Sequence, residues 1–369
     1  MKMDLLPWVW LSTLNKISPK KKKQLIDFFD NAGSVWDASL PELRLAPFLS
    51  NKNIDQLFCK EYKKDAEKIL KRTIENKIDV VTIQDKDYPE ILKHIYDPPI
   101  VLYAKGKLKP DECCIGIVGS RKATVYGLEM AENTAFDLSK GGITVISGMA
   151  RGIDSHAHYG AIKGGGRTIA VLGCGLDIVY PKENIYLMEQ IIKNGAVISE
   201  NIIGTQPLPH NFPARNRIIS GMSKGIAVIE AGEKSGSLIT ADYALEQGRD
   251  VFAVPGNINR WNSKGTNNLI KEGAKLVTGS EDIFEELNLC SNINLEYRNI
   301  EDSAQSFMLN KLGKDEKKIL DILRYEDLHI DTISEKTGIS MDIVNSLLII
   351  MELKGLIIQV PGKVFKLKE

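Results

Sequence analysis

The sequence predicts an α/β protein whose central part is a Rossmann-like, mostly parallel sheet with helices on both faces. Between residues 112 and 288, short β-rich runs follow one another and most end in glycine: CCIGIVG, ITVISG, TIAVLG, AVIS, GIAVIEA, DVFAVPG and AKLVTG. Segments of helical length separate most of them. Continuously apolar strands that alternate with helices are typical of a parallel sheet buried on both faces. We therefore expect a sheet domain over 76–288, with 76–111 as an extension that leads into it.

The segment before this sheet has the apolar spacing of helices. In residues 1–75, Trp8, Leu11 and Leu14 recur at helical intervals, as do later apolar residues. The segment holds 14 Lys and Arg against 10 Asp and Glu. We predict a small helical domain there, with the run Lys20 to Lys23 as a solvated helix start.

A second small domain is predicted at the other end of the chain. Residues 289–312 are polar and aperiodic and indicate a linker. Over 313–369, two helices, the turn TGIS, a third helix (MDIVNSLLIIMELKG) and two short strands follow, the outline of a winged-helix domain. The third helix has one Lys and no Arg. It therefore suits a protein partner at least as well as duplex DNA, and both alternatives stay open.

Composition limits the classes of function. Lys plus Arg and Asp plus Glu both number 48, so no overall charge attracts the whole molecule to a polyanion. No apolar run is long enough to span a membrane, and the charges that follow the first apolar stretch do not fit a signal peptide. The five cysteines show no CxxC spacing. We expect reduced, buried thiols and a cytoplasmic protein.

The ends of the predicted strands carry the unusual residues. Gly119-Ser120-Arg121 follows the first strand, and SGMARGID follows the second with Ser147, Gly148 and Arg151. In a parallel sheet, ligands bind beyond the carboxyl ends of the strands. We expect the following helix starts to offer unpaired N–H groups to an anion, with Arg121 adding a bidentate phosphate contact.

The densest basic cluster is HNFPARNRIISG, residues 210–221. Here Arg215, Asn216 and Arg217 fall near a predicted helix start, and Phe212 could stack on a base, a pairing expected of proteins that bind single strands. The alternative is a buried Phe with two structural arginines. In the later run EAGEKSGSLITA, Gly236, Ser237 and Thr240 suit a turn that binds an anion.

Other site chemistries fit the sequence poorly. Gly173-Cys174-Gly175 lacks the third glycine of a dinucleotide fingerprint, so we expect no nicotinamide or flavin cofactor. His156 and His158 diverge on a helix and lack partners at zinc-site spacing, so we expect no metal. No Ser–His–Asp order or G-x-S-x-G elbow indicates nucleophilic catalysis.

Taken together, these stretches resemble the DNA-processing protein A family (DprA, also called Smf). The matching motifs cover roughly residues 80–290 in order: YPEILKHIYDPPIVLYAKG, GIVGSR, SGMARGID, AVLGCGLDIVYP, HNFPARNRIISG, EAGEKSGSLITA, VPGNI and GTNNLIKEGA. The resemblance implies a non-enzymatic homodimer that binds single-stranded DNA without strong sequence preference and loads RecA recombinase onto it during natural transformation. It also implies that 1–75 is similar to a sterile-alpha-motif (SAM) domain.

Carried onto matching positions and joined to the strand-end residues above, the resemblance predicts a DNA-binding site. We predict that its residues are Gly119, Ser120, Arg121, Ser147, Gly148, Arg151, Gly173, Gly175, Asn211, Phe212, Arg215, Asn216, Arg217, Gly236, Ser237 and Thr240. Backbone amides and arginines recognise phosphates and not sequence, so affinity should fall steeply with salt.

Two other functions remain as alternatives. The first is a nucleotide hydrolase of the lysine-decarboxylase-like (LOG) type, although the P-G-G-x-G-T-x-x-E run of that family is absent from EAGEKSGSLITA. The second is a transcriptional regulator in which the winged helix binds an operator and the sheet binds a nucleotide.

Overall fold

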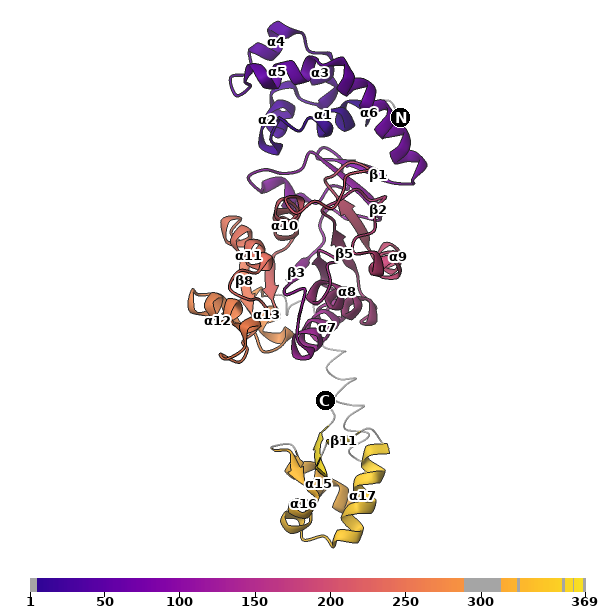
Figure 1. Cartoon of the computed structure of the whole chain (residues 1–369), viewed down its shortest axis with the longest axis vertical. Coiled ribbons are helices and arrows are strands. Elements are labelled where there is room, and N and C mark those ends of the chain that lie inside the picture. The colour runs from indigo at the N-terminus through magenta and orange to yellow at the C-terminus, as the bar shows by residue number, and fades with distance from the viewer. Residues whose placement is uncertain (1–4, 289–312, 324–325, 354–355, 361, 368–369) are drawn as a thin grey trace. The chain divides into compact units, whose positions relative to one another are not determined.

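The computed structural model describes residues 5–288, 313–323, 326–353, 356–360 and 362–367. The chain divides into two compact units, Met1–Ile293 and Asn294–Glu369 (Figure 1). The predicted linker, 289–312, lies outside the described residues. The division of the first unit at residue 75 stays a prediction, because the helices before that point and the sheet after it belong to the same compact unit.

The first unit is built around a nine-stranded sheet with the order β1-β2-β6-β5-β4-β3-β7-β8-β9. The run from β6 to β9 is parallel throughout, and each predicted β-rich run forms one of its strands. These strands are β3 (Cys114–Val118), β4 (Thr144–Ser147), β5 (Thr168–Val171), β6 (Ala196–Ser199), β7 (Gly225–Val228), β8 (Asp250–Ala253) and β9 (Lys275–Leu276). The predicted α/β class and mostly parallel sheet are confirmed.

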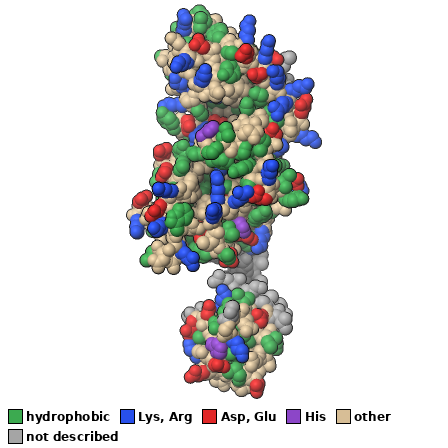
Figure 2. Space-filling model, in the orientation of Figure 1, with side chains coloured by type: hydrophobic (Ala, Val, Ile, Leu, Met, Phe, Trp, Pro, Cys, Tyr) green, Lys and Arg blue, Asp and Glu red, His purple; other side chains and the backbone are tan. Residues whose placement is uncertain are grey.

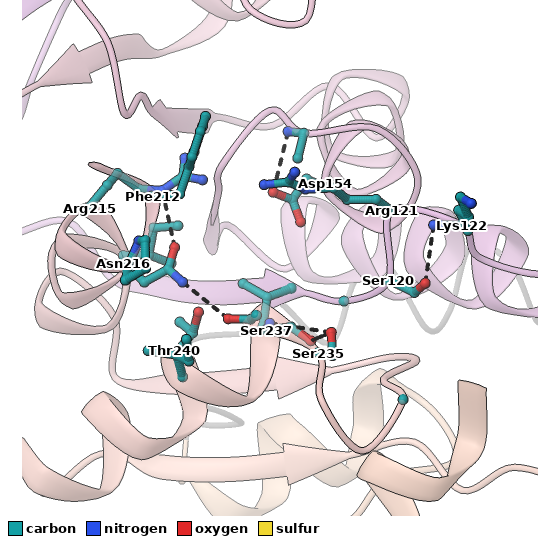
Figure 3. A pocket seen from close by; sticks show the side chains of 18 of the residues that line it. Ser120, Arg121, Lys122, Asp154, Phe212, Arg215, Asn216, Ser235, Ser237 and Thr240 are labelled. Carbon is teal, nitrogen blue, oxygen red and sulfur yellow. Dashed lines mark hydrogen bonds between the residues drawn. The ribbon is translucent and has the colours of Figure 1, made fainter. Parts of the chain in front are cut away.

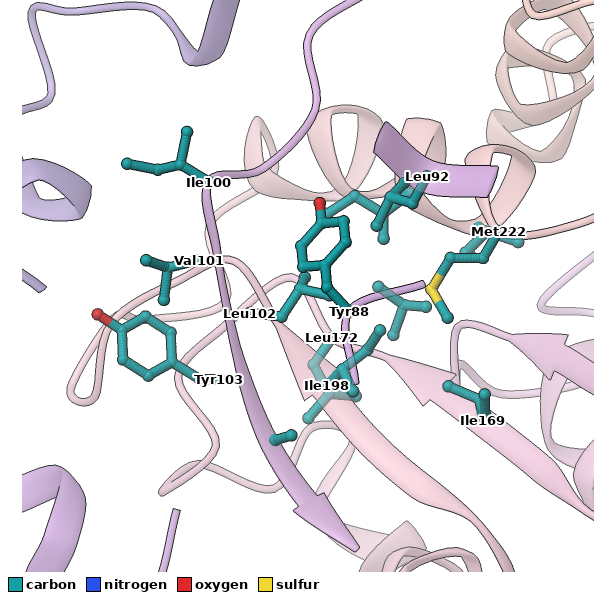
Figure 4. Close-up of a cluster of buried hydrophobic side chains, with 14 of the residues drawn as sticks. Tyr88, Leu92, Ile100, Val101, Leu102, Tyr103, Ile169, Leu172, Ile198 and Met222 are labelled. Carbon is teal, nitrogen blue, oxygen red and sulfur yellow. The ribbon is translucent and has the colours of Figure 1, made fainter. Parts of the chain in front are cut away.

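Two strands come from the extension that the sequence left unassigned. β1 (Asp79–Thr82) and β2 (Val101–Gly106) form an antiparallel pair, and β2 also pairs antiparallel with β6. Leu102 packs among Tyr88, Leu172 and Ile198, while Val101 and Tyr103 point to the other side (Figure 4). This alternation is the period of two expected of a strand, so the extension lengthens the sheet at one edge.

Helices cover both faces of the parallel part. Ile115 and Ile117 of β3 belong to a core with α7 and α8, whereas Ile226 and Val228 of β7 belong to a core with α10 and α11. The helices and short 3₁₀ turns of this part are η2 (Glu90–His94), α7 (Val125–Lys140), α8 (Ile153–Lys163), η3 (Lys182–Asn184), α9 (Ile185–Asn194), α10 (Asn211–Gly221), α11 (Gly236–Glu246), η4 (Trp261–Ser263), α12 (Lys264–Lys271) and α13 (Ser280–Glu286).

Within the described residues, six α-helices precede the sheet, as the apolar spacing predicts. They are α1 (Leu6–Thr13), α2 (Pro19–Phe29), α3 (Ala32–Asp37), α4 (Leu40–Arg44), α5 (Asn51–Phe58) and α6 (Lys60–Glu75). Ser12 of α1 hydrogen-bonds Tyr103 of β2 at 2.9 Å. Lys20 to Lys23 do start α2, but they are not simply solvated: Lys22 is buried, and Lys20 donates to the Tyr96 hydroxyl at 2.7 Å.

An ion cluster centred on the buried Arg217 of α10 lies near the contacts between α2 and the extension. Arg217 Nε lies 3.2 Å from the Asp97 carboxylate, Nη1 donates to the Asp97 carbonyl at 2.6 Å, and Nη2 binds Glu200. Burial lowers the pKa of Lys22 to about 8. The nearby charge of Glu200 raises this pKa, and that of Arg217 lowers it further. The cluster therefore links α10 to the extension and, through Lys22, to α2.

His158 of α8 is buried against β5. Its Nδ1 lies 2.6 Å from the Thr168 hydroxyl, which itself donates to the Val145 carbonyl at 2.8 Å, so Nδ1 carries the proton. Nε2 is buried and has no partner. Burial, with a smaller contribution from the charge of Arg215, lowers the pKa of His158 to about 3.

The described part of the second unit shows three helices and a small sheet. Its elements are α15 (Lys314–Leu323), β10 (Leu328–His329), α16 (Ile330–Thr337), α17 (Met341–Leu353), β11 (Ile357–Val360) and β12 (Val364–Leu367). The strand order is β10-β12-β11, and both pairings are antiparallel. Gly338 ends α16 with a φ of 67°, a left-handed conformation that suits glycine. This is the predicted helix–turn–helix with a hairpin.

Charges of both signs are mixed on the visible face of each unit. Figure 2 shows Lys and Arg side chains interspersed with Asp and Glu within each unit, as the balanced composition predicts. Within the described ranges, no helix combines the length and the apolar character that crossing a membrane requires.

We predict that His158 makes the fold sensitive to acid. The unfolded side chain takes up a proton near pH 6.5, whereas the folded one resists until about pH 3. The unfolded state thus binds more protons in this window, so the free energy of unfolding falls as pH drops from 6.5 towards 3, by up to about 1.4 kcal/mol per pH unit. Denaturant titrations from pH 7 to 4 on the wild type and His158→Asn should show a shallower decline in the variant. Equal slopes would contradict this assignment.

We also predict that Arg217→Ala destabilises the first unit. The change leaves Asp97 and Glu200, whose side chains are 32% and 30% exposed, without their shared partner, which should cost about 2 kcal/mol. Thermal unfolding measures the loss, with Arg151→Ala as the control, because Arg151 pairs with Glu183 on the surface. A variant with the wild-type Tm would show that the cluster does not hold α10 in place.

Candidate functional site

The candidate site lies where the strand order of the sheet reverses. β3 stands between β4 and β7, so the loops that follow these strands diverge and leave a crevice. A pocket of about 600 Å³ occupies this position. Its walls come from the loops after β3, β4 and β7, from the first turns of α10 and α11, and from η4 (Figure 3).

The pocket brings together nine of the residues predicted from the sequence. Those that line it are Gly119, Ser120, Arg121, Phe212, Arg215, Asn216, Gly236, Ser237 and Thr240. Those that do not are Ser147, Gly148, Arg151, Gly173, Gly175, Asn211 and Arg217.

Arg215 is buried in the pocket wall. It donates to the carbonyls of Gly148, at 2.9 Å, and Val171, which lie at the ends of β4 and β5. Burial lowers the pKa of Arg215 to about 10, with the charge of Asp154 opposing this. Its Nε also donates to the Asn216 side chain at 3.2 Å. Arg215 thus holds α10 against the sheet.

The Asp154 carboxylate is also bound within the protein. It accepts backbone N–H groups from Gly148 at 3.2 Å and Ala150 at 3.3 Å. Burial raises the pKa of Asp154, although the charges of Arg215 and Arg121 and the two amides act in the opposite direction. The carboxylate therefore shapes the loop after β4.

In the loop between β3 and α7, three amides that precede the helix start are bound within the protein and are not available to an anion. Ser120 N donates to the Glu230 carbonyl at 2.7 Å, and Thr124 N donates to the Glu230 carboxylate at 2.9 Å. Lys122 N donates to the Ser120 hydroxyl at 3.1 Å. The buried Glu230 side chain supplies the anion that this helix start prefers, so a ligand must find its cations elsewhere.

Arg121 and Lys122 provide those cations. Both are exposed, and neither forms an ion pair with any residue in the described part of the chain. The Arg121 guanidinium carbon lies 5.2 Å from the centroid of the Phe212 ring. Figure 3 shows Arg121 extending from one wall towards Phe212 on the other, above the hydroxyl-bearing floor.

Aromatic and small polar side chains complete the walls. Phe212 lies 5.6 Å, centroid to centroid, from Tyr180, and Trp261 forms another wall with 59% of its surface exposed. On the floor, the hydroxyls of Ser235 and Ser237 are 2.7 Å apart, and Asn216 donates to the Gly236 carbonyl at 3.3 Å. The pocket thus combines flat apolar surfaces, hydroxyls and unpaired cations.

Gly236 differs from the other glycines of the site. A Cβ at Gly148 would lie 2.5 Å from the Arg215 guanidinium, and one at Gly173 would lie 3.0 Å from Phe212. A Cβ at Gly119 would lie 2.6 Å from Ile153. At Gly236, by contrast, nothing stands within 4 Å. The protein's own packing therefore explains the first three glycines but not Gly236, where the backbone is open to an incoming molecule.

The remaining predicted residues have roles around the pocket. The Ser147 hydroxyl donates to the Ile117 carbonyl at 2.6 Å, and Asn211 donates to the Gln206 carbonyl at 3.1 Å. A Cβ at Gly175 would clash with the loop that follows β6. Arg151 is exposed and pairs with Glu183. Arg217 lies in the ion cluster, the structural alternative weighed for the arginines of 210–221.

Sequence reasoning missed several lining residues, notably Lys122, Tyr180, Ser235 and Trp261. Lys122 and Ser235 directly adjoin predicted residues, so their position in the same strand-end loops was a usable signal. Tyr180 follows Gly175 closely and lies inside the matching motif AVLGCGLDIVYP, so that motif was also a usable signal. Trp261 stands far from any predicted site residue, and no local pattern marks it. Among the described residues, no group of three or more His, Cys, Asp or Glu side chains could hold a metal ion.

Comparisons with known proteins agree on one family. The family model described as DNA recombination-mediator protein A matches residues 79–288, and the model of the DprA winged helix domain matches residues 308–363. The DNA processing protein DprA of Bacillus subtilis is 42% identical over 262 residues, which cover 68% of this chain and 88% of that protein. Protein Smf of Synechocystis is 33% identical over 96% of both chains.

Solved structures agree with the sequence comparisons. The crystal structure of DNA processing protein A from Streptococcus pneumoniae superposes with a TM-score of 0.62 at 35% identity, covering 76% of this chain and 97% of that one. A structure of the Helicobacter pylori protein, described as showing a unique single-stranded DNA binding mode, gives 0.50 at 29% identity, over 57% and 95%. Together with the fold and the pocket, these matches show that the chain belongs to the DNA recombination-mediator protein A family, DprA/Smf, and carries its winged-helix domain.

Proposed function

We propose that the pocket binds single-stranded DNA, with Arg121 and Lys122 contacting phosphates and Phe212 stacking on a base. The observation that carries this proposal is the pair of exposed, unpaired cations beside an aromatic face. Cations that follow a backbone and aromatic rings that accept any base are the features of single-strand binding without sequence preference. The single-stranded DNA binding described for the Helicobacter pylori relative supports the same ligand.

The open backbone at Gly236 gives the phosphate a place to approach. Ser237 N donates a long hydrogen bond to the Ser235 hydroxyl, at 3.4 Å, and both Ser235 and Ser237 line the pocket. A phosphate oxygen placed there could accept from hydroxyls on one side and from Arg121 on the other. Arg217 has no part in this proposal, because its guanidinium is buried against Asp97 and Glu200.

We further propose that the protein acts as a cytoplasmic homodimer that loads RecA onto the bound strand and does not cut DNA. Membership of a family described as a recombination mediator supports this. Assembly of RecA filaments on single strands, with and without this protein, tests the loading, and sedimentation tests the dimer. A monomer that leaves RecA assembly unchanged would contradict both statements.

The two alternative functions receive less support. In the run EAGEKSGSLITA, Glu230 is buried and bound to Thr124, so it does not line the pocket as a hydrolase carboxylate would. α17 has no Lys or Arg, and Ile343, Ile349 and Ile350 are among its exposed residues, which does not favour contact with an operator. Release of free base from nucleoside monophosphates would instead support the nucleotide hydrolase.

We predict that Arg121→Ala and Lys122→Ala each weaken single-strand binding about tenfold, since a charged hydrogen bond contributes about 1.5 kcal/mol or more. All sequences should be affected alike, and the slope of log affinity against log salt should fall by about 0.7 for each lost contact. Fluorescence anisotropy with labelled oligo-dT across a salt series measures both. Lys163→Ala is the matched control, because Lys163 lies at the far end of α8. Unchanged affinity in both pocket variants, with folding intact, would refute the site.

We predict that Gly236→Ala weakens binding without lowering the Tm. The added methyl group meets no protein atom within 4 Å, so the fold should tolerate it, but it occupies the space where a phosphate would approach. Anisotropy and thermal unfolding of the same preparation separate the two effects. Full affinity in this variant would show that no ligand comes close to the Gly236 backbone.

A further inference from the structure

A rim next to the pocket combines exposed apolar side chains with basic ones. It consists of Lys122, Val125 and Tyr126 at the start of α7 and of Ile258, Arg260 and Trp261 in the loop between β8 and α12. Ile258 is 80% exposed, Val125 71% and Trp261 59%. Exposed large apolar side chains gathered at one place indicate a binding surface.

The two segments of the rim are held together. The Asn262 side chain donates to the Lys122 carbonyl at 2.8 Å, and the Tyr126 hydroxyl donates to the Pro255 carbonyl at 3.2 Å. The Ala231 amide donates to the Asn262 carbonyl at 2.8 Å. Loop and helix start therefore form one surface, and this surface exists before any ligand arrives.

Trp261 is fixed on this surface. Its ring lies so close to the Gly232 backbone that a Cβ at Gly232 would be 2.3 Å from it. One part of the ring faces the pocket, yet more than half of the side chain remains exposed. A rigid aromatic face that is half open to solvent is suited to stacking on a flat partner.

The charges of the rim favour a polyanion. The loop segment PGNINRW contains Arg260 and no acidic residue, and Lys122 adds a second cation. Neither cation forms an ion pair with a described residue. Lys122 and Trp261 belong to both the pocket and the rim, so the two surfaces are continuous. A strand that leaves the pocket at this side therefore contacts the rim next.

We propose that this rim is a second nucleotide subsite, which holds the continuation of the strand bound in the pocket. Trp261 stacks on a base, and Lys122 and Arg260 contact the phosphates on either side of it. The inference rests on the proposed function of the pocket and extends it: the footprint of one protein molecule is longer than the pocket alone accommodates.

Oligonucleotides of different length test the subsite in the full-length protein. With oligo-dT of 20 nucleotides, Trp261→Ala should lower affinity about tenfold, the effect of losing one stacked base. With a trinucleotide that fills only the pocket, its effect should be much smaller. Trp261→Phe should restore most of the loss, and Arg260→Ala should weaken only the longer oligonucleotide. Tyr186→Ala, which removes an exposed aromatic residue from α9, is the control and should bind both lengths normally.

Tryptophan fluorescence gives an independent readout. The chain has four tryptophans, of which Trp8 and Trp10 are buried and Trp36 is half-buried under Lys63. Quenching by the longer oligonucleotide should therefore come mainly from Trp261 and disappear in Trp261→Phe. Equal loss of affinity for both lengths in Trp261→Ala would overturn the second subsite and assign Trp261 to the pocket alone. Failure of the wild type to bind any single strand would instead refute the proposed function itself.

Discussion

The guanidinium of Arg215 is buried where β4, β5 and α10 meet, and the architecture of the pocket depends on it. It donates to the carbonyls at the ends of both strands and lies against Gly148. Its central carbon is 5.9 Å from the centroid of the Phe212 ring. A buried charge of this kind is tolerated only with good acceptors and a compensating charge nearby. The two carbonyls are the acceptors, and Asp154 is the compensating charge. Phe212, and with it part of the aromatic wall, lies beside this contact.

The need of a buried charge for partners separates the structural charges of this site from those that are available to a ligand. Arg215, Arg217, Asp154 and Glu230 are buried or nearly so, and each is bound to partners within the chain. Arg121 and Lys122 are exposed and unpaired within the described residues. On the proposed function, phosphates would bind to the charges that folding does not use, and the salt dependence of binding should reflect only these few.

Sequence patterns predicted the parallel sheet because β-rich runs ending in glycine are a local signal, and nine predicted site residues do line one pocket. The pair β1 and β2 was missed because β2 joins the sheet by an antiparallel pairing with β6, which is distant in sequence. The roles of Arg215 and Arg217 could not be distinguished, because their partners, Gly148, Val171, Asp97 and Glu200, lie far away in the chain. Trp261 was missed because the loop after β8, which brings it to the pocket, has a course that no local sequence pattern predicts.

The central claim is that a single strand lies in the pocket between the loops after β3 and β7. Ultraviolet crosslinking of the wild-type protein to oligo-dT, followed by mass spectrometry of the nucleotide-bearing peptides, tests this most directly. The account predicts crosslinks on the peptides that contain Phe212, Tyr180 or Trp261, and their disappearance when excess unlabelled single strand competes. Crosslinks confined to α1–α6 or to the winged-helix unit would contradict it.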